Sequence, residues 1–225
     1  MKLLAIDTAS TLCAACVWDA GAGRELGRAV EDIGKGHAER LMGVIAEALS
    51  AGGTTYADIG AIAVSVGPGS FTGIRVGVAA ARGLALALKI PALGVTTLSA
   101  IAEEARQAYP RRRIIASIDA RRDELYVEDH APDGSLSFGP AIVNVADAGR
   151  LLPGLPPVLA GSGSDLLAAL DSSADRAGGG ATADIAVYAR LAASGHIHGS
   201  PPKPLYLRGP DARPQDGFAL ARKVS

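Results

Sequence analysis

The sequence carries almost no excess charge of either sign. Its 22 lysines and arginines are balanced by 23 aspartates and glutamates, which leaves a formal net charge of -1 over 225 residues. A protein that binds RNA alone through the phosphates usually has a basic excess or a basic stripe. The densest basic run is Arg111-Arg112-Arg113, with Arg106 nearby, and we interpret it as solvated surface charge. Any work on RNA is therefore expected to depend on a second protein.

Cysteine is almost absent. The two cysteines, Cys13 and Cys16, have the C-x-x-C spacing. Redox motifs of this form usually open a helix, whose N-terminus lowers the thiol pKa, whereas residues 11–18 are expected to form a strand. A structural zinc site would need two further ligands at suitable spacing. We interpret both residues as buried strand cysteines.

The sequence also lacks a long apolar run that is free of charge. The first apolar run, residues 3–6, is too short for the core of a signal peptide. Residues 73–90 approach the length of a membrane span, but they include Arg75, Arg82 and Lys89, and charges at that depth are costly in lipid. We expect a soluble, cytoplasmic protein that does not contact a membrane.

The motifs of the common catalytic sites are missing as well. There is no G-x-S-x-G elbow and no H-E-x-x-H pair. A glycine-rich loop spans residues 67–73, but Ile74-Arg75 follows it where a P-loop has Lys-Ser/Thr. His196 and His198 stand in a glycine-rich segment without further ligand types at metal-site spacing. The sequence therefore predicts neither catalytic residues nor a metal site.

What is present is an α/β pattern that occurs twice. The first copy has expected strands at 2–7, 11–18, 25–30 and 59–66 and helices at 37–50 and 73–89. The second has expected strands at 113–119, 124–130, 136–143 and 157–161, a loop-like stretch at 172–183 and a helix at 184–194. Asp7 and Asp119, 112 residues apart, each end a strand that precedes a hairpin. We predict two lobes, at residues 1–105 and 106–200, and a C-terminal tail at 201–225.

Three polar residues after the first strand could approach a phosphate or its metal ion. They are Asp7, Thr8 and Ser10, and they are the weak candidates for nucleotide binding in this chain. The same residue types are ordinary at the end of a strand, because Asp, Ser and Thr side chains satisfy loose backbone donors there. The sequence leaves both interpretations open.

The two helices of the first lobe could form a protein interface. The second is apolar or small almost all round, and a 225-residue chain has limited means of covering two sides of one helix. An interface with a partner and a purely internal core are both open interpretations; the first is preferred. The predicted interface residues are Leu41, Ile45, Leu49, Gly73, Gly77, Ala80, Ala81 and Leu84.

Several segments together resemble one family. They are Leu4-Ala-Ile-Asp-Thr-Ala-Ser10, His37-Ala-Glu-Arg-Leu41, Val64-Ser-Val-Gly-Pro-Gly-Ser-Phe-Thr-Gly-Ile-Arg-Val-Gly77, Gly94-Val-Thr-Thr-Leu98 and Pro204-Leu-Tyr-Leu-Arg208. The chain is similar over nearly its whole length to the TsaB, or YeaZ, family. This resemblance implies an actin-like ATPase (ribonuclease H-like) fold with two β-β-β-α-β-α lobes.

The resemblance also implies a role and partners. It implies a non-catalytic subunit that binds a TsaD-like transferase and supports threonylcarbamoyl transfer to adenosine in tRNA, with a TsaE-like ATPase as a further partner. TsaD-like proteins carry a His-x-x-x-His pair where this chain has Thr97 and Ile101, so the catalytic metal is expected in the partner. We expect the chain to have no cofactor of its own, although ATP or ADP could bind at an interface of the complex. We expect it to contact tRNA only through the complex and to form a homodimer when it is alone.

Two other functional classes remain alternatives. One is an independent enzyme on the same fold: an ATPase, a kinase or a metallopeptidase-like hydrolase. It would require turnover by the isolated chain and sensitivity to Asp7→Ala. The other is a tRNA-binding module, which would bind tRNA without partners and lose affinity steeply with salt.

Overall fold

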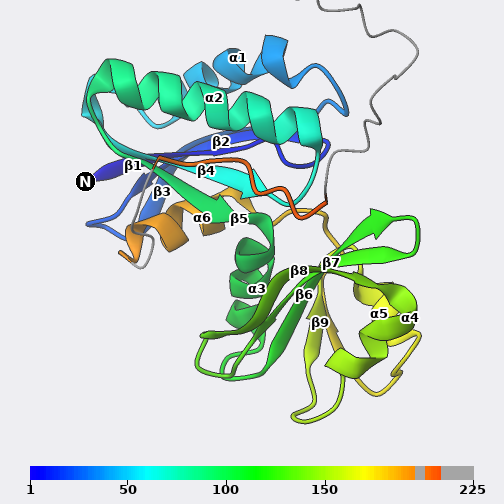
Figure 1. Ribbon diagram of the computed structural model, residues 1–225. Helices are drawn as coiled ribbons and strands as arrows, with labels where there is room; N and C mark the ends of the chain where they lie inside the picture. Colours follow the sequence, from blue (N-terminus) through cyan, green and yellow to red (C-terminus); the bar gives the residue numbers. More distant parts are fainter. Residues whose placement is uncertain (196–200, 209–225) are drawn as a thin grey trace, which may run out of the picture.

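The computed structural model describes residues 1–195 and 201–208. It contains two five-stranded mixed sheets, with strand orders β3-β2-β1-β4-β5 and β10-β9-β6-β7-β8 (Figure 1). The second order, read in reverse, is the first order with every strand number raised by five. The duplication predicted from Asp7 and Asp119 is therefore confirmed as a repeated sheet topology.

The first sheet begins as an antiparallel meander and continues with parallel strands. Strands β1, β2 and β3 pair antiparallel, while β4 pairs parallel to β1 and β5 parallel to β4. The elements are β1 (Lys2–Asp7), β2 (Leu12–Asp19), β3 (Arg24–Asp32), α1 (His37–Ala51), the 3-10 helix η1 (Tyr56–Asp58), β4 (Ile59–Gly67), α2 (Phe71–Leu88), β5 (Ala92–Thr96) and α3 (Thr97–Ala108).

The second sheet repeats this plan with shorter pieces. Strands β6, β7 and β8 form the meander, and β9 and β10 add in parallel. The elements are β6 (Ile114–Arg121), β7 (Glu124–His130), β8 (Leu136–Asn144), α4 (Val145–Ala148), the 3-10 helix η2 (Gly149–Leu151), β9 (Val158–Ala160), α5 (Ser164–Ala168), β10 (Asp175–Ala177) and α6 (Ile185–Ala193).

The sequence pattern missed several elements of this plan. Strand β5 and helix α3 were not predicted, and β10 lies inside the stretch 172–183 that was expected to be loop-like. Strand β10 is three residues long, and the unpredicted helices α4 and α5 have four and five residues, whereas β9 was predicted at 157–161. Elements this short show no complete hydrophobic period, so tertiary packing rather than local sequence defines them.

The last helix of each repeat crosses to the other lobe. Helix α3 packs mainly on β6 and β7 of the second sheet, whereas α6 packs on β1 and β2 of the first (Figure 1). A single apolar cluster joins the facing sheets through residues such as Leu3, Ile114 and the fully buried Tyr188. The structure thus places α6, from the segment predicted as the second lobe, against the first sheet, and one of the three apolar clusters of the described residues spans both lobes.

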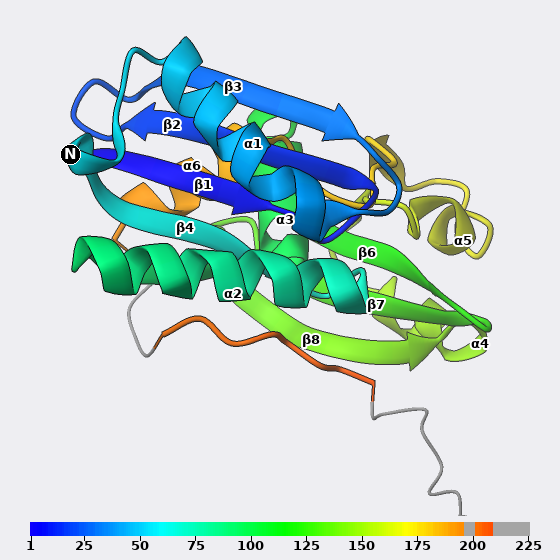
Figure 2. The same ribbon diagram turned by 90° about the horizontal axis from the view of Figure 1, so that it is seen from above.

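Helices α1 and α2 lie side by side on the opposite face of the first sheet (Figure 2). Leu41, Ile45 and Leu49 of α1 point into the core there, as their one-sided spacing requires. Covering both faces of the sheet explains why β1 and β4 are continuous apolar runs.

Candidate functional site

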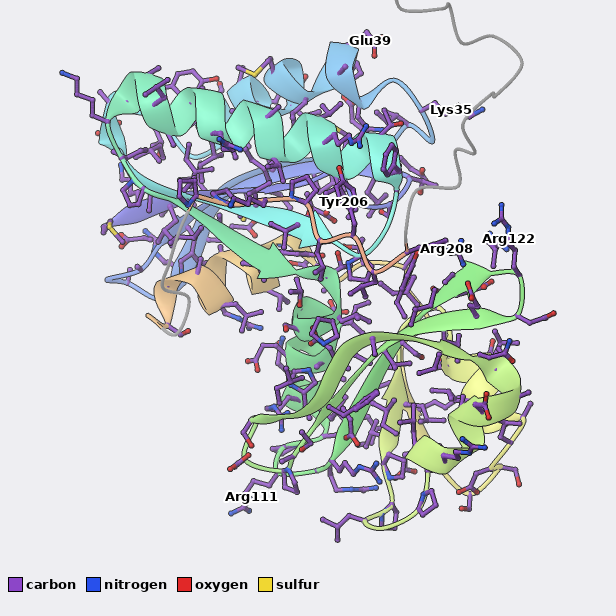
Figure 3. All side chains as sticks on the ribbon, viewed as in Figure 1. Lys35, Glu39, Arg111, Arg122, Tyr206 and Arg208 are labelled. Atoms are coloured by element: carbon purple, nitrogen blue, oxygen red, sulfur yellow. The ribbon has the colours of Figure 1, made fainter. Side chains whose placement is uncertain are left out.

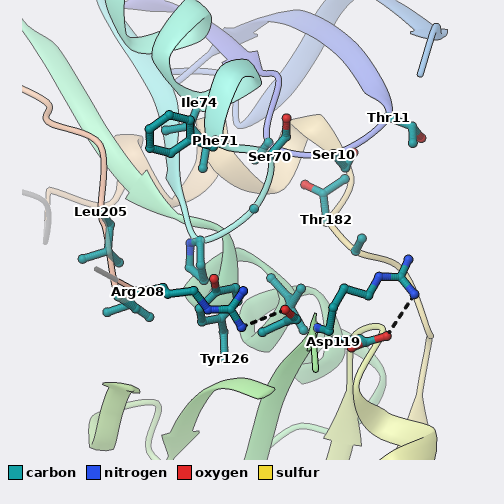
Figure 4. A pocket seen from close by; sticks show the side chains of 18 of the residues that line it. Ser10, Thr11, Ser70, Phe71, Ile74, Asp119, Tyr126, Thr182, Leu205 and Arg208 are labelled. Atoms are coloured by element: carbon teal, nitrogen blue, oxygen red, sulfur yellow. Dashed lines mark hydrogen bonds and ion pairs between the residues drawn. The ribbon is translucent and has the colours of Figure 1, made fainter. Parts of the chain in front are cut away.

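A cavity of about 1300 Å³ opens between the lobes at the carboxyl ends of β1 and β6. Its walls come from the turn after β1, the loop before α2, the β6–β7 hairpin and residues 180–182 and 205–208 (Figure 4). Among the lining side chains, Arg75, Arg121 and Arg208 are basic and Asp119 is a carboxylate. This interlobe cleft is large enough to receive a small-molecule ligand.

Asp7, the first of the predicted nucleotide candidates, lies beneath this cleft rather than in its lining. Its Oδ1 accepts a hydrogen bond of 2.9 Å from the Ala9 backbone N–H, and its Oδ2 accepts one of 2.6 Å from the Thr182 hydroxyl. Both carboxylate oxygens of this buried side chain therefore have protein donors. Asp119, the equivalent residue of the second repeat, makes the same kind of contact: it accepts a hydrogen bond of 2.7 Å from the backbone N–H of Arg121, two residues later.

Thr8 and Ser10 also hold the turn together. The buried Thr8 hydroxyl donates to the Gly73 carbonyl at 2.7 Å, which fastens the turn to the first turn of α2. Ser10 accepts a bond of 3.2 Å from the Leu12 N–H, and of the three candidates it alone lines the cleft. The structure thus favours the turn-capping interpretation for Asp7 and Thr8 and leaves Ser10 as a cleft residue.

The contact between Asp7 and Thr182 continues into the core. The Thr182 hydroxyl lies 2.6 Å from the hydroxyl of Tyr188 on α6. Burial raises the pKa of the Tyr188 phenol well above its ordinary value, and the nearby Asp7 carboxylate acts in the same direction. The phenol therefore stays neutral and serves as a hydrogen-bonding group that joins α6 to the end of β1.

Residues 202–208, here called the strap, run from the first lobe to the second. The Leu205 N–H donates to the Val66 carbonyl at 2.8 Å, and Arg75 Nε donates to the Tyr206 hydroxyl at 2.6 Å. Arg208 donates to the Ala120 carbonyl at 3.0 Å and forms an ion pair with Glu124 in the second lobe. The sequence indicated only a proline-stiffened tail here, because contacts across such distances leave no periodic signal.

The predicted partner residues are mostly buried within this chain. Leu41, Ile45, Leu49 and Ala81 belong to the core beneath the two helices, and Gly73 and Gly77 are buried where α2 meets Thr8. A Cβ at either glycine would lie under 3.0 Å from a Thr8 oxygen. The close approach predicted for these small residues is real, but its partner is the turn after β1. These six residues cannot line an interface in this conformation, and the correction leaves the half-buried Ala80 and Leu84.

The accessible side of the two helices has a different residue set. Leu86 is 81% exposed and Met42 is exposed on the neighbouring helix. We call this the outer helix surface; its members are Met42, Ala46, Ala79, Arg82, Gly83 and Leu86. By length and composition α2 could cross a membrane, yet its inner side packs on the sheet and Arg75 and Arg82 lie on its exposed side.

The described residues provide no cluster for a metal ion. Within residues 1–195 and 201–208, no group of three or more His, Cys, Asp or Glu side chains is placed to hold one. His196 and His198, the histidine pair that the sequence did not support as a metal site, lie outside the described residues. Cys13 and Cys16 are both buried in β2, in agreement with the strand interpretation.

Comparison with known proteins identifies the class first. Two solved structures from Pseudomonas aeruginosa, one of YeaZ and one of a protein described as similar to peptidase YeaZ, superimpose with TM-scores of 0.76 and 0.78. They are 28% and 27% identical to this chain and cover 92% of it and 99% of their own length. Component A of (R)-2-hydroxyglutaryl-CoA dehydratase from Acidaminococcus fermentans shares the fold alone, with a TM-score of 0.53 and 11% identity. The repeated topology and the interlobe cleft are those of an actin-like ATPase fold, as predicted.

The relatives in sequence then give the family. A family model described as TsaD, tRNA N6-adenosine threonylcarbamoyltransferase, matches residues 30–160. TsaB of Escherichia coli, a tRNA threonylcarbamoyladenosine biosynthesis protein, is 38% identical over 133 residues, which cover 59% of this chain and 56% of that protein. A Mycobacterium tuberculosis protein of uncharacterised function is 36% identical over 94% of both chains. The chain belongs to the TsaB (YeaZ) family. It spans about half the length of the E. coli TsaB that it matches.

Proposed function

We propose that this chain is a non-catalytic subunit that binds a TsaD-like transferase and supports threonylcarbamoyl transfer to adenosine in tRNA. The observation that carries the proposal is the outer helix surface, where two neighbouring helices of a TsaB-family chain leave apolar and small side chains exposed. A leucine as exposed as Leu86, next to small side chains on an uncovered side of a helix, is typical of a protein interaction site.

The composition of the outer helix surface suits another helix pair. Ala79 and Gly83 lie one turn apart on α2 and have little bulk, so a second helix can approach the backbone closely. Leu86 and Met42 would supply apolar area at the two sides of that contact. Burying a leucine side chain that is now exposed contributes about 1.5–3 kcal/mol to association, before the entropic cost.

The geometry of the cleft favours an accessory role for this chain over a catalytic one. Both oxygens of the buried Asp7 carboxylate already accept hydrogen bonds from within the chain, from Ala9 and Thr182, which agrees with a structural role for this residue. Thr97 and Ile101, at the positions of the transferase histidines, are buried side chains of α3 and offer no imidazole. In this proposal the partner supplies the metal site, any ATP or ADP lies at an interface between subunits, and a TsaE-like ATPase joins the pair.

The test is reconstitution from purified components. The TsaD-like partner is combined with the wild-type chain or with Leu86→Arg, and co-elution and tRNA modification are measured. The matched control is Leu155→Arg, which places the same charge at an exposed leucine of the second lobe. We expect Leu86→Arg to weaken partner binding at least tenfold and the control to change it less than twofold.

Two results would overturn the proposal. One is a wild-type chain that neither co-elutes with the partner nor raises its modification rate. The other is turnover of ATP or of a peptide by the isolated chain that Asp7→Ala abolishes, which would favour the independent enzyme. Self-association through the same surface predicts that Leu86→Arg also converts a homodimer of the isolated chain into a monomer.

A further inference from the structure

The β6–β7 hairpin has an unusual backbone for its residues. Arg121, Arg122 and Asp123 have φ values of 63°, 57° and 57°, all in the left-handed region. Glycine or asparagine fits such a turn with little strain, whereas an ordinary side chain costs of the order of 1 kcal/mol at each position. A hairpin that keeps two arginines there retains their side chains at a cost in stability.

One of these arginines, Arg121, stands at the mouth of the interlobe cleft, and Arg122 is next to it in the hairpin. Arg121 lines the cleft with a side chain that is 85% exposed, and Arg122 extends from the tip of the hairpin into solvent (Figure 3). Asp119 contacts Arg121 at 3.4 Å, a distance that still leaves guanidinium donors for another acceptor. The hairpin thus presents two long basic side chains beside an open cavity.

The opposite wall of the cleft mouth is aromatic. Phe71 is 54% exposed and Tyr206 is 48% exposed, with ring centroids 5.4 Å apart. The Arg75 guanidinium lies 3.7 Å from the centroid of the Phe71 ring and fixes this pair in place. The two ring planes are tilted by 39°, so another planar group can stack on the exposed face of one ring at a time.

Exposed rings facing guanidinium groups across an open cavity suit one class of ligand. In single-stranded nucleic acid each base can stack on an aromatic side chain, while the adjoining phosphate accepts hydrogen bonds from arginine. We propose that this cleft mouth, defined by Phe71, Tyr206 and Arg121 with Arg122 beside it in the hairpin, binds unpaired nucleotides of RNA when the chain is in its complex. The inference rests on the proposed function, which supplies tRNA as the RNA.

The small number of phosphate contacts agrees with the balanced net charge of the chain. Two arginines neutralise about two phosphates, too few for tight binding by the isolated chain. Within a complex the same contacts add to those of the partner, because the second binding event is then intramolecular. The chain would thereby help to hold the tRNA in place on the complex.

The experiment measures binding of a hairpin RNA with an unpaired loop to the purified complex, as a function of salt. The test variant is Arg121→Ala/Arg122→Ala. Its matched control is Arg111→Ala/Arg150→Ala, because Arg111 also has a positive φ, of 56°, and Arg150 is also paired with an aspartate and 84% exposed. Both double variants remove two charges from the second lobe, and Figure 3 shows Arg111 far from the hairpin.

We expect the test variant to weaken loop-RNA binding at least fivefold and to reduce the slope of log K against log salt by about 1.4, which is 0.7 for each lost single-strand phosphate contact. The control should change affinity less than twofold. Phe71→Ala should weaken binding of the unpaired loop but not of a fully paired duplex. Co-elution with the partner, which tests the proposed function, should be unchanged in all variants.

The inference fails if the complex forms but the test and control variants bind loop RNA equally well or equally weakly. It also fails if the variants lose affinity for free AMP or ATP and keep full affinity for RNA, since the cleft mouth would then be a mononucleotide site. Loss of the complex in the wild-type chain would instead refute the proposed function.

Discussion

Replacing Gly77 by alanine tests how α2 is seated on the first lobe. An added Cβ would lie under 3.0 Å from the Thr8 hydroxyl oxygen and 3.5 Å from a methyl group of Val64. Helix α2 must move away from the sheet, and the Thr8 side chain must also rotate and lose its 2.7 Å hydrogen bond to the Gly73 carbonyl. Both responses destabilise the fold, because the site is buried and already closely packed.

The change in the free energy of unfolding combines two costs and one gain. Overpacking costs about 2 kcal/mol and the lost hydrogen bond about 1 kcal/mol. Alanine recovers about 1 kcal/mol through its higher helix propensity, which leaves a net loss of about 2 kcal/mol. For a domain of this size the midpoint of thermal unfolding should fall by about 4–8 °C.

Gly83 provides the matched control in the same helix. It is exposed, and a Cβ built there meets nothing within 4 Å, so Gly83→Ala should raise stability by up to about 1 kcal/mol. Urea denaturation of both variants measures the contrast. In a Thr8→Ala background the cost of Gly77→Ala should fall to below about 1 kcal/mol, since the obstructing hydroxyl is gone. Equal stabilisation by the two alanines would refute the close contact between α2 and Thr8.

The remaining predictions concern three buried or capped groups. Cys13 and Cys16 should not react with a thiol reagent at pH 8 until the chain unfolds, because burial raises the pKa of Cys13 to about 11 and that of Cys16 still further; rapid labelling of the native chain would contradict this. Arg113→Ala should cost about 3 kcal/mol in urea denaturation by leaving the buried Asp129, 2.6 Å from Arg113 Nη2, without its cation; an unchanged midpoint would count against that ion pair. The Thr55 N–H and hydroxyl lower the pKa of Asp58 in the folded chain. The ionised Asp58 therefore stabilises the fold above its unfolded pKa of about 3.9, and this stabilisation is lost as the pH falls through the lower folded pKa. Thermal midpoints measured from pH 5 to pH 2 should fall less in Asp58→Asn than in the wild type.

The local pattern of the sequence was sufficient for the long elements of the first lobe. The apolar runs of β1 and β4 and the one-sided spacing of Leu41, Ile45 and Leu49 each span several hydrophobic periods, so they predict strand and helix directly. In the second lobe the apolar run at 157–161 also predicted β9 correctly, but β10 has only three residues and lies in a stretch expected to be loop-like. A strand as short as β10 becomes stable only by pairing with β9, which no local pattern reports.

The candidate site shows the same division. The sequence identified Asp7, Thr8 and Ser10 as polar residues beyond a strand, but it could not decide whether their atoms face a ligand or the protein. That depends on Thr182, which is 175 residues away from Asp7 along the chain. The strap and the aromatic side of the cleft were missed for the same reason, since Tyr206 and Arg75 are 131 residues apart.

The sequence by itself determined the repeated α/β unit, the small residues along α2 and the family, because these depend on neighbours in the chain and on motifs that can be read in order. Only the tertiary structure decided which side of α2 each residue occupies. Gly73 and Gly77 suit an external helix by their size alone, and the fold uses them against Thr8 instead. Small size permits close approach from any direction, and only the packing of the whole chain chooses what approaches.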